Sequence, residues 1–255
     1  MLILISPSKT LNFEKPITGL STQPEFVKEA SRLIKPLRKL KIDQLMELMD
    51  ISPKLARLNQ ERYYLWQPEF AGKATARQAI FAFRGNVYTG LDADTLSPAD
   101  IEAAQQQLRI LSGLYGVLRP LDLIRPYRLE MGIDLEVGKC SNLYEFWQKK
   151  ITSKIRLDLD QIGSNMVINL ASVEYYKVID PKKLKARIVT PEFREAKEGT
   201  YKMISFFAKE ARGMMTRFIL QNGINSEEQL HAFDSDGYCY NGRISIPGRP
   251  VFTRG

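Results

Sequence analysis

A chain of 255 residues is long enough to bury a substantial core, as one large domain or two small ones. Its 44% hydrophobic and 26% charged residues are typical of a globular protein and exclude a low-complexity or disordered chain. The net charge of +8 favours an anionic partner, such as nucleic acid, a phosphorylated small molecule or an acidic membrane surface. Solubility alone is the alternative role for this charge.

The N-terminal apolar run does not have the features of a targeting segment. It covers only residues 2–5, and neither a basic segment nor a cleavage site accompanies it. No stretch of the sequence approaches the length of a membrane span. Cys140 and Cys239 lack the spacing of a disulfide framework or a CxxC motif, which indicates reduced thiols. We therefore expect a cytoplasmic protein without membrane association.

The first part of the chain predicts one strand followed by several helices. Residues 2–5 read as a buried strand that leads into a loop over residues 6–10. Helical spacing covers residues 24–40, where Pro36 is expected to kink or split the helix, and recurs over residues 42–49. Ser52 and Pro53 have the pattern of an N-cap followed by proline at the first helical position. Together these segments predict a helical subregion over about residues 24–67.

The rest of the chain mixes helices and strands without internal repeats or a long linker. The expected elements are a strand or helix end at 79–83, a loop at 85–90, a capped helix at 101–108, a helix at 143–159, a strand at 166–170, a helix from near residue 172, strands at 187–193 and 201–207, a helix at 208–220 and a strand-like tail at 237–252. This mixture predicts an α+β fold, with residues 1–255 as a single compact domain of mixed sheet and surrounding helices.

The loop at residues 6–10 is the first candidate site. It follows a strand, and α/β folds place ligands at the carboxyl ends of their strands. Its hydroxyl groups and the ammonium of Lys9 suit a phosphate, although the glycines of a phosphate-binding loop are missing. A structural turn is one alternative. A Ser-Lys nucleophile at Ser6 and Lys9 is another, without the companion motifs of such enzymes.

Residues 111–118 carry two glycines among apolar residues after a predicted helix. This pattern is similar to the hairpin of a helix-hairpin-helix element, in which backbone N–H groups approach DNA phosphates. Gly113 and Gly116 would permit that close approach, and Pro120 could start the second helix. A buried strand that ends in a glycine turn fits the same residues equally well.

Two basic clusters are candidates for nucleic-acid contact. The first places four arginines beside Tyr115 and Tyr127 in a turn-rich segment, namely Arg109, Arg119, Arg125 and Arg128. Arginine offers forked donors to phosphate and tyrosine stacks on bases, whereas the alternative is a solvated basic face. In the second cluster, Lys209 and Arg212 share a helix face because they lie three residues apart.

Residues 169–177 join a predicted strand to a predicted helix. Glu174 fits either a general base or an ordinary acid in the first turn of a helix, and Lys177 ends the segment. Because residues 6–10 also follow a strand, we expect the two segments to meet at one edge of the sheet. Lys9 and Glu174 are therefore the candidate catalytic groups if the protein is an enzyme.

The supply of metal ligands is small. His231 is the single histidine, and it fits a surface histidine better than a catalytic base because no nucleophile lies near it in the sequence. One histidine and two separated cysteines also argue against a dedicated zinc or haem site. We expect no cofactor and no metal site.

Five blocks of the sequence resemble, in order, signature blocks of the YaaA peroxide-stress family. They are LILISPSKT, FRGNVYTGL, LRILSGLYGVLRPLDLIRPYRLEMG, NLASVEYYK and AKEARGMMTRFI. The resemblance runs from residue 1 to about residue 238. It implies a role in the response to hydrogen peroxide that is tied to limiting free intracellular iron. It also implies one compact α+β fold with a helix-hairpin-helix element and a positively charged cleft that binds DNA, and it implies no settled enzymatic reaction.

The leading hypothesis is a DNA-binding protein of the peroxide stress response that limits oxidative DNA damage and free iron. It would select duplex or branched DNA by structure, with an affinity that falls with salt. The expected DNA contacts are Lys9, Arg109, Gly113, Gly116, Arg119, Arg125, Arg128, Lys177, Lys209 and Arg212. The alternative is an enzyme acting on a nucleotide or damaged base in a basic cleft. Direct iron sequestration is a third hypothesis, which the scarcity of His and Cys ligands disfavours.

Overall fold

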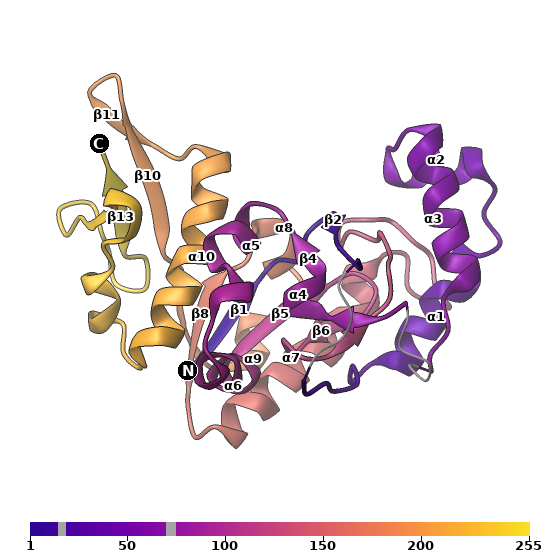
Figure 1. Ribbon diagram of the computed structural model, residues 1–255, viewed down its shortest axis with the longest axis horizontal. Coiled ribbons are helices and arrows are strands. Elements are labelled where there is room, and N and C mark those ends of the chain that lie inside the picture. Colours follow the sequence, from indigo (N-terminus) through magenta and orange to yellow (C-terminus); the bar gives the residue numbers. More distant parts are fainter. Residues whose placement is uncertain (15–18, 70–74) are drawn as a thin grey trace.

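A five-stranded sheet runs through the centre of the molecule (Figure 1). The computed structural model describes residues 1–14, 19–69 and 75–255. The sheet has the strand order β6-β5-β1-β8-β9. Its strands are β1 (Leu2–Ile5), β5 (Leu108–Ser112), β6 (Gly116–Leu118), β8 (Met166–Leu170) and β9 (Arg187–Val189). All four residues of β1 are fully buried, which explains why the strand is a continuous apolar run rather than an alternating one.

The order of these strands creates a topological switch point at β1. The chain passes from β1 to its parallel neighbour β5 on one side and later to its parallel neighbour β8 on the other. β9 extends the sheet in parallel beside β8, whereas β6 returns antiparallel to β5. The connections after β1 and β8 therefore begin at the same edge of the sheet. In open sheets of this kind, ligands bind in the crevice outside the carboxyl ends of such strands.

Helices α5 (Asn86–Leu91) and α10 (Ser205–Asn222) cross at unusually short range. A Cβ atom built on Gly213 would lie 1.9 Å from the carbonyl oxygen of Val87, and one on Gly90 would lie 2.1 Å from that of Glu210. Only glycine allows two helix backbones to approach so closely. This crossing fixes α10 over the residues that start α5.

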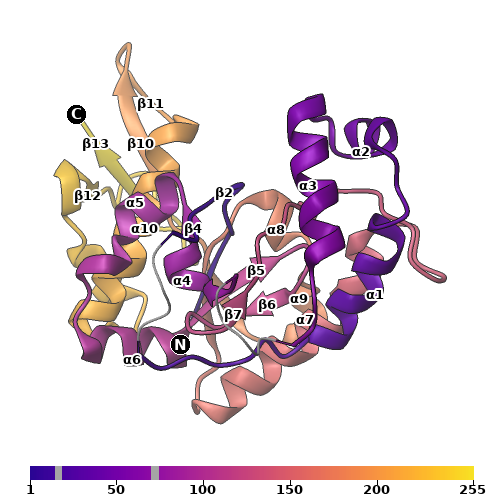
Figure 2. The same cartoon turned by 45° about the vertical axis from the view of Figure 1, so that its right-hand side comes forward.

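Three helices form a separate group beside the sheet (Figure 2). They are α1 (Val27–Leu37), α2 (Ile42–Met49) and α3 (Pro53–Leu65), so the helices expected between residues 24 and 67 are confirmed. Pro36 lies inside the last turn of α1. The Ser52 side chain accepts a hydrogen bond from the Leu55 N–H, as expected of an N-cap with proline at the next position.

A second, four-stranded sheet lies at the other end of the molecule together with α10 (Figure 1). Its order is β11-β10-β13-β12, from β10 (Glu192–Lys197), β11 (Thr200–Lys202), β12 (Cys239–Tyr240) and β13 (Val251–Arg254). The buried rings of Phe193, Phe233, Tyr238 and Phe252 contact one another beneath it. The β10–β11 hairpin, which turns at Glu198 and Gly199 as expected, projects from the molecule.

The remaining elements are short apart from two helices. Helix α6 (Pro98–Gln107) is capped by Ser97, and α7 (Leu143–Gln161) is the long amphipathic helix expected at 143–159. The short elements are β2 (Thr10–Leu11) paired with β4 (Phe83–Arg84), β3 (Arg77–Gln78) paired with β7 (Leu123–Ile124), α4 (Ala79–Ala82), α8 (Val173–Tyr176), α9 (Pro181–Leu184) and the 3₁₀ turns η1 (Ala93–Thr95), η2 (Glu228–Ala232) and η3 (Ser235–Gly237). None of the described helices is both long and apolar enough to cross a membrane.

Of the two interpretations of residues 111–118, the structure confirms the buried strand that ends in a glycine turn and does not show the helix-hairpin-helix element that the family resemblance implied. Those residues form the β5–β6 hairpin, in which Ser112 pairs with Gly116, and every residue from 108 to 118 is buried. Gly116 has a φ of +71°, and a Cβ on Gly113 would lie 2.1 Å from the carbonyl oxygen of Leu129. The glycines therefore serve a turn and a close internal packing contact, not an approach to an external backbone.

Two other boundaries differ from the expectation. The glycine pair at residues 85 and 90 suggested a loop, but only Gly85 has the positive φ of a turn, and α5 begins immediately after it. Gly90 is helical because it lies in the crossing with α10. The strand expected at 201–207 ends at Lys202, and residues from Ser205 onward start α10.

The close helix crossing can be tested by whether a Gly→Ala substitution raises or lowers the free energy of unfolding. In an exposed helix, Gly→Ala stabilises by up to about 1 kcal/mol. At Gly213 the new methyl group would overlap the backbone of α5, so we expect Gly213→Ala to lower the free energy of unfolding by about 1–3 kcal/mol. Urea denaturation measures this. The control is Gly242→Ala, whose Cβ would lie 3.4 Å from the Tyr240 ring in ordinary contact, and a stabilised Gly213→Ala would contradict the crossing.

Candidate functional site

A cavity of about 400 Å³ opens at the carboxyl edge of the central sheet, where β1 and β8 end. We call it the carboxyl-edge pocket. Its walls come from the loop after β1, the start of α5, the start of α8 and one face of α10. The lining residues are Ser6, Pro7, Ser8, Lys9, Thr10, Gly85, Asn86, Val87, Tyr88, Ser172, Glu174, Tyr175, Lys209 and Arg212. The pocket therefore joins three of the segments singled out in the sequence.

Hydrogen bonds between the two strand ends form the floor of the pocket. The Ser172 N–H donates to Ser6 Oγ at 2.9 Å, and Ser6 Oγ lies 3.3 Å from Ser172 Oγ. The Tyr88 hydroxyl donates to the carbonyl oxygen of Ser6 at 3.1 Å, which ties α5 to the same loop. The expectation that residues 6–10 and 169–177 meet at one sheet edge is thus confirmed.

Gly85 shapes the wall opposite this floor. Its φ is +114°, and a Cβ there would lie 2.9 Å from Ser8 Oγ. Any side chain at this position would strain the backbone and crowd the Ser8 hydroxyl. The Ser8 Oγ itself accepts a hydrogen bond from the Thr10 N–H at 3.1 Å. The loop after β1 is therefore held in a defined turn, with the Lys9 side chain on the pocket wall.

Lys9 shares a buried carboxylate with Arg128. Its Nζ lies 3.1 Å from Glu130 Oε1, and an Arg128 guanidinium nitrogen lies 2.8 Å from the same oxygen. The Glu130 side chain is only 9% exposed, whereas that of Lys9 is 64% exposed. The Tyr63 hydroxyl donates to the carbonyl oxygen of Arg128, which ties this segment to α3. Arg128 thus balances the charge of Glu130 from outside the pocket lining, while the mostly exposed Lys9 side chain lines the pocket.

Two polar atoms in this cluster have no hydrogen-bond partner within the described part of the chain, namely Glu130 Oε2 and Arg128 Nε. Both residues line a small void of about 10 Å³ beside the carboxyl-edge pocket. Glu130 was not among the candidate residues predicted from the sequence. The signal that could have found it is an acidic residue between Leu129 and Met131, since an isolated charge in an apolar segment is buried only when it has a partner.

Lys209 and Arg212 enter the pocket from α10. Their side chains have no hydrogen-bond or ion-pair partner among residues 1–14, 19–69 and 75–255. Desolvation by burial lowers the pKa of Arg212 from its ordinary value, yet a guanidinium remains charged in proteins. Burying a charge without a partner is costly, so the partly buried Arg212 is the group of the pocket that most needs an anionic ligand, and the exposed Lys209 lies three residues before it on the same helix.

Glu174 lies at the rim of the pocket in the first turn of α8. Its Oε1 accepts a hydrogen bond from the Gly132 N–H at 3.2 Å, and its carbonyl oxygen accepts one from the Tyr144 hydroxyl at 2.9 Å. Lys177 lies outside the lining, with its Nζ 4.9 Å from the centre of the Tyr144 ring. The exposed carboxylate of Glu174 therefore has one oxygen engaged and faces the same space as Lys9.

Three buried tyrosines belong to this region: Tyr88 and Tyr175 line the pocket, and Tyr127 lines the small void beside it. Burial raises the pKa of the Tyr88, Tyr127 and Tyr175 hydroxyls above the usual range. They are therefore neutral at physiological pH and act only through hydrogen bonds, such as the 2.7 Å contact between Tyr127 and Ser112.

No three His, Cys, Asp or Glu side chains of the described residues gather closely enough to hold a metal ion.

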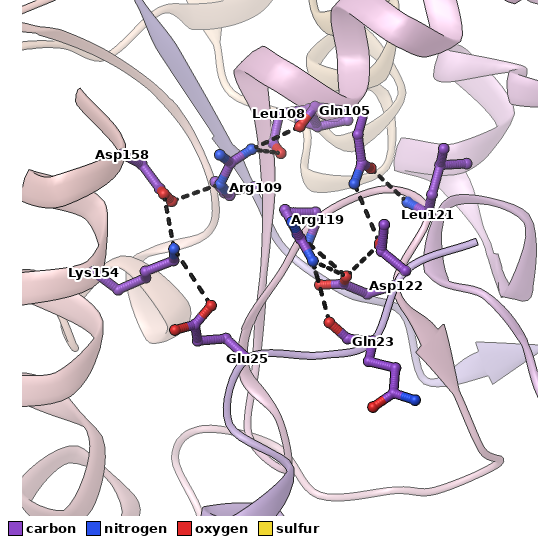
Figure 3. A network of polar contacts seen from close by, with 11 residues as sticks. Gln23, Glu25, Gln105, Leu108, Arg109, Arg119, Leu121, Asp122, Lys154 and Asp158 are labelled. Atoms are coloured by element: carbon purple, nitrogen blue, oxygen red, sulfur yellow. Dashed lines mark hydrogen bonds and ion pairs between the residues drawn. The ribbon is translucent and has the colours of Figure 1, made fainter. Parts of the chain in front are cut away.

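A second hollow, of about 540 Å³, lies at the start of β1 and β5. Arg109, Arg119 and Lys154 line it, but each already has an acidic partner (Figure 3). The Arg109 Nε lies 2.7 Å from Asp158, and Lys154 lies 3.1 Å from the same carboxylate. Despite its larger volume, this hollow presents less unpaired charge than the carboxyl-edge pocket.

The arginines of the first basic cluster are thus divided between different places. Arg109 is 5% exposed and also donates to backbone carbonyl oxygens of α6 and β5 (Figure 3). Arg119 pairs with Asp122 at 3.0 Å, and Arg125 donates to the carbonyl oxygens of Gln67 and Glu69. These guanidinium groups therefore connect neighbouring segments of the fold through hydrogen bonds and ion pairs. Of the basic residues expected to contact DNA, the structure brings Lys9, Lys209 and Arg212 together in one pocket, with Arg128 behind them.

Comparison with known proteins supports the resemblance of the sequence blocks. The model of the family described as peroxide stress protein YaaA matches residues 1–243. A UPF0246 protein of Aliivibrio fischeri strain MJ11 is 52% identical over 255 residues, covering 100% of this chain and 98% of the relative. A UPF0246 protein of Shewanella baltica strain OS195 is also 52% identical over 255 residues, covering 100% and 99% of the two chains.

The buried position of Arg109 predicts that its replacement affects folding first. Arg109→Met leaves Asp158 buried with only Lys154, so we expect the free energy of unfolding to fall by about 3 kcal/mol. Lys202→Ala, which breaks an exposed ion pair with Glu198, is the control and should cost less than about 1 kcal/mol. Chemical denaturation compares the two. Equal stability of both variants would instead point to a binding role for Arg109.

Proposed function

Because the chain belongs to the YaaA peroxide stress protein family, we propose that it protects DNA during peroxide stress by binding DNA phosphates at the carboxyl-edge pocket. The single observation that carries this proposal is the pair of cations, Lys209 and Arg212, that face the pocket without an acidic partner in the described part of the chain. Lys9 adds a third cation, and Ser6, Ser8 and Thr10 add hydroxyl groups. Ammonium, guanidinium and hydroxyl groups together suit a phosphate.

The size of the pocket supports a preference for distorted DNA. A volume of about 400 Å³ lies within the range of small-molecule sites and is suitable for one nucleotide. A nucleotide inside a regular duplex cannot enter such a hollow unless it leaves the stack, which costs least at mismatches, damaged bases, branches and single-stranded regions. The proposal therefore includes selection by DNA structure more than by sequence.

The same contacts offer a link to iron. DNA phosphates carry a condensed atmosphere of cations, and a protein that neutralises them releases those cations. Iron held at DNA reacts with peroxide beside the bases that it damages. A protein bound through Lys9, Lys209 and Arg212 would displace iron from the phosphates that it covers. Limiting free intracellular iron is part of this proposal.

The proposal predicts a specific change in salt dependence. For duplex DNA, each lost phosphate contact lowers the slope of log K against log salt by about 0.9. We expect Lys209→Ala/Arg212→Ala to lower the slope by about 2 and to weaken binding uniformly across sequences. Fluorescence anisotropy with duplex and four-way-junction DNA over a salt series measures this.

A matched double variant on another surface controls for net charge. Lys35→Ala/Lys39→Ala removes two exposed cations of α1 and its C-terminus, and its salt slope should equal that of the parent. A parent protein that binds neither DNA at low salt, or a pocket variant with an unchanged slope, would contradict the proposal.

A second candidate function is an enzyme acting on a nucleotide or a damaged base in the same pocket. The observation that favours it is the shared lining by Lys9 and Glu174, an amine and a carboxylate that follow the carboxyl ends of two neighbouring parallel strands. Amine and carboxylate groups in one pocket suit nucleophilic and acid–base catalysis of cleavage at a nucleoside. Phosphate binding by Lys209 and Arg212 would then serve to hold the substrate.

Glu174→Gln separates the two functions because it keeps the shape of the side chain and removes only its charge. If the protein is an enzyme, we expect the parent to convert oligonucleotides that carry an oxidised base and Glu174→Gln to lose conversion while keeping its DNA affinity. Mass spectrometry of the oligonucleotide detects the product. Absence of any product with the parent would leave DNA binding alone.

A further inference from the structure

An apolar patch lies next to the carboxyl-edge pocket and takes no part in either function described above. It contains Tyr201 at the end of the β10–β11 hairpin, Met203, and two phenylalanines at the start of α10. The exposed fractions are 41% for Tyr201, 53% for Met203, 59% for Phe206 and 37% for Phe207. Of these residues, Phe206 and Phe207 contact each other, and exposed apolar residues that gather on one surface mark binding sites more often than isolated ones do. We call these residues the aromatic patch.

One ring of the patch is held in place and supports the other. The Arg254 guanidinium lies 4.8 Å from the centre of the Phe207 ring, and the Phe207 ring meets that of Phe206 edge to face at 5.5 Å. Arg254 is itself fixed by ion pairs with Glu195 and Asp236. Phe206 is therefore presented on a rigid support, which lowers the entropic cost of stacking another ring on it.

The position of Phe206 on α10 connects the patch to the pocket. Phe206 lies three residues before Lys209, and Lys209 three before Arg212, so each of these pairs is adjacent on the helix surface. Phe206 and Arg212 themselves are about 120° apart around the helix axis. The rise of an α-helix is about 1.5 Å per residue, which places Arg212 about 9 Å along the helix from Phe206. Bases along a nucleic-acid strand are spaced by about 3.4 Å. The distance therefore corresponds to about two or three nucleotides.

The charges around the patch favour a nucleic acid as its occupant. Lys209 borders it on the pocket side and Lys197 lies on β10 beside it, both without an acidic partner in the described part of the chain. Lys202 and Arg254 also lie beside it, but their charges are balanced by Glu198, Glu195 and Asp236. Aromatic rings interleaved with cations are the pattern of surfaces that bind single-stranded nucleic acid, in which bases stack on the rings and cations follow the backbone. A hydrophobic protein segment would gain nothing from this basic surrounding.

We propose that Phe206, supported by Phe207 and flanked by Tyr201 and Met203, is a base-stacking site for nucleotides adjacent to the one whose phosphate enters the carboxyl-edge pocket. This inference rests on the proposed function. It defines the path of the nucleic acid on the protein: an unpaired strand runs along α10 from the β10–β11 hairpin to the pocket. The structural preference for DNA then arises because bases must be unpaired to stack on Phe206.

The test uses a single-stranded oligonucleotide with one 2-aminopurine, whose fluorescence changes when the base stacks on a ring. Phe206→Ala should weaken binding about 10-fold and abolish the fluorescence change, while its salt slope equals that of the parent. Phe206→Trp should restore both affinity and fluorescence change. Tyr64→Ala is the matched control, because Tyr64 is a 78% exposed aromatic residue on α3, and it should bind as the parent does.

The outcomes separate the two proposals. Binding that depends on Lys209 and Arg212 but is unaltered in Phe206→Ala would overturn the base-stacking site and leave phosphate binding intact. Light scattering that shows a dimer of the parent but a monomer of Phe206→Ala would assign the patch to self-association and also overturn it. A parent that binds duplex or four-way-junction DNA but not this oligonucleotide at low salt would overturn the base-stacking site alone, and a parent that binds none of them would overturn both proposals.

Discussion

The crossing of α5 and α10 is the contact on which the carboxyl-edge pocket depends. Gly90 and Gly213 let the two helix backbones touch, with Cβ positions only 1.9–2.1 Å from carbonyl oxygens of the facing helix. This contact brings Lys209 and Arg212 over the loop after β1, although they lie about two hundred residues away in the sequence. A wider crossing would move both cations away from Lys9. The pocket is therefore assembled by backbone packing, and its cations need not form ion pairs to be held there.

Charge pairing decides which hollow can accept an anion. At the amino edge of the sheet, Arg109 and Lys154 share Asp158, so the charges there are balanced within the fold. At the carboxyl edge, Glu130 is shared by Lys9 and Arg128, and the two cations of α10 remain unbalanced by any described residue. The net charge of the chain therefore does not by itself locate an anion site, whereas the cations that have no acidic partner do.

Local patterns in the sequence predicted much of the framework. The apolar runs of β1 and β8, the Ser-Pro caps of α3 and α6 and the long helix α7 depend on interactions within a few residues, so the sequence shows them directly. The meeting of the loops after β1 and β8 also followed, because parallel strands end at the same edge.

Features that depend on distant contacts were not predictable in this way. Gly113 and Gly116 looked suited to a hairpin on DNA, but they turn the buried β5–β6 hairpin and pack against residues that come later in the chain. Gly90 suggested a loop because the residues around it in the sequence do not reveal that it packs against the backbone of α10. The pairing of Arg109 with Asp158 was not predicted for the same reason, since an ion pair between distant segments leaves no local pattern. Glu130 does stand out locally, as a charge between two apolar residues, but its partner Lys9 does not.

The central claim is that the carboxyl-edge pocket binds the phosphate of a nucleotide. A titration of the ¹⁵N-labelled protein with a 5′-phosphorylated dinucleotide, followed through its backbone amide shifts, tests this claim most directly. We predict that the largest shifts cluster at residues 6–10, 85–88, 172–175 and 209–212. Shifts that cluster instead around Arg109, Arg119 and Lys154, or no saturable shifts at all, would contradict it.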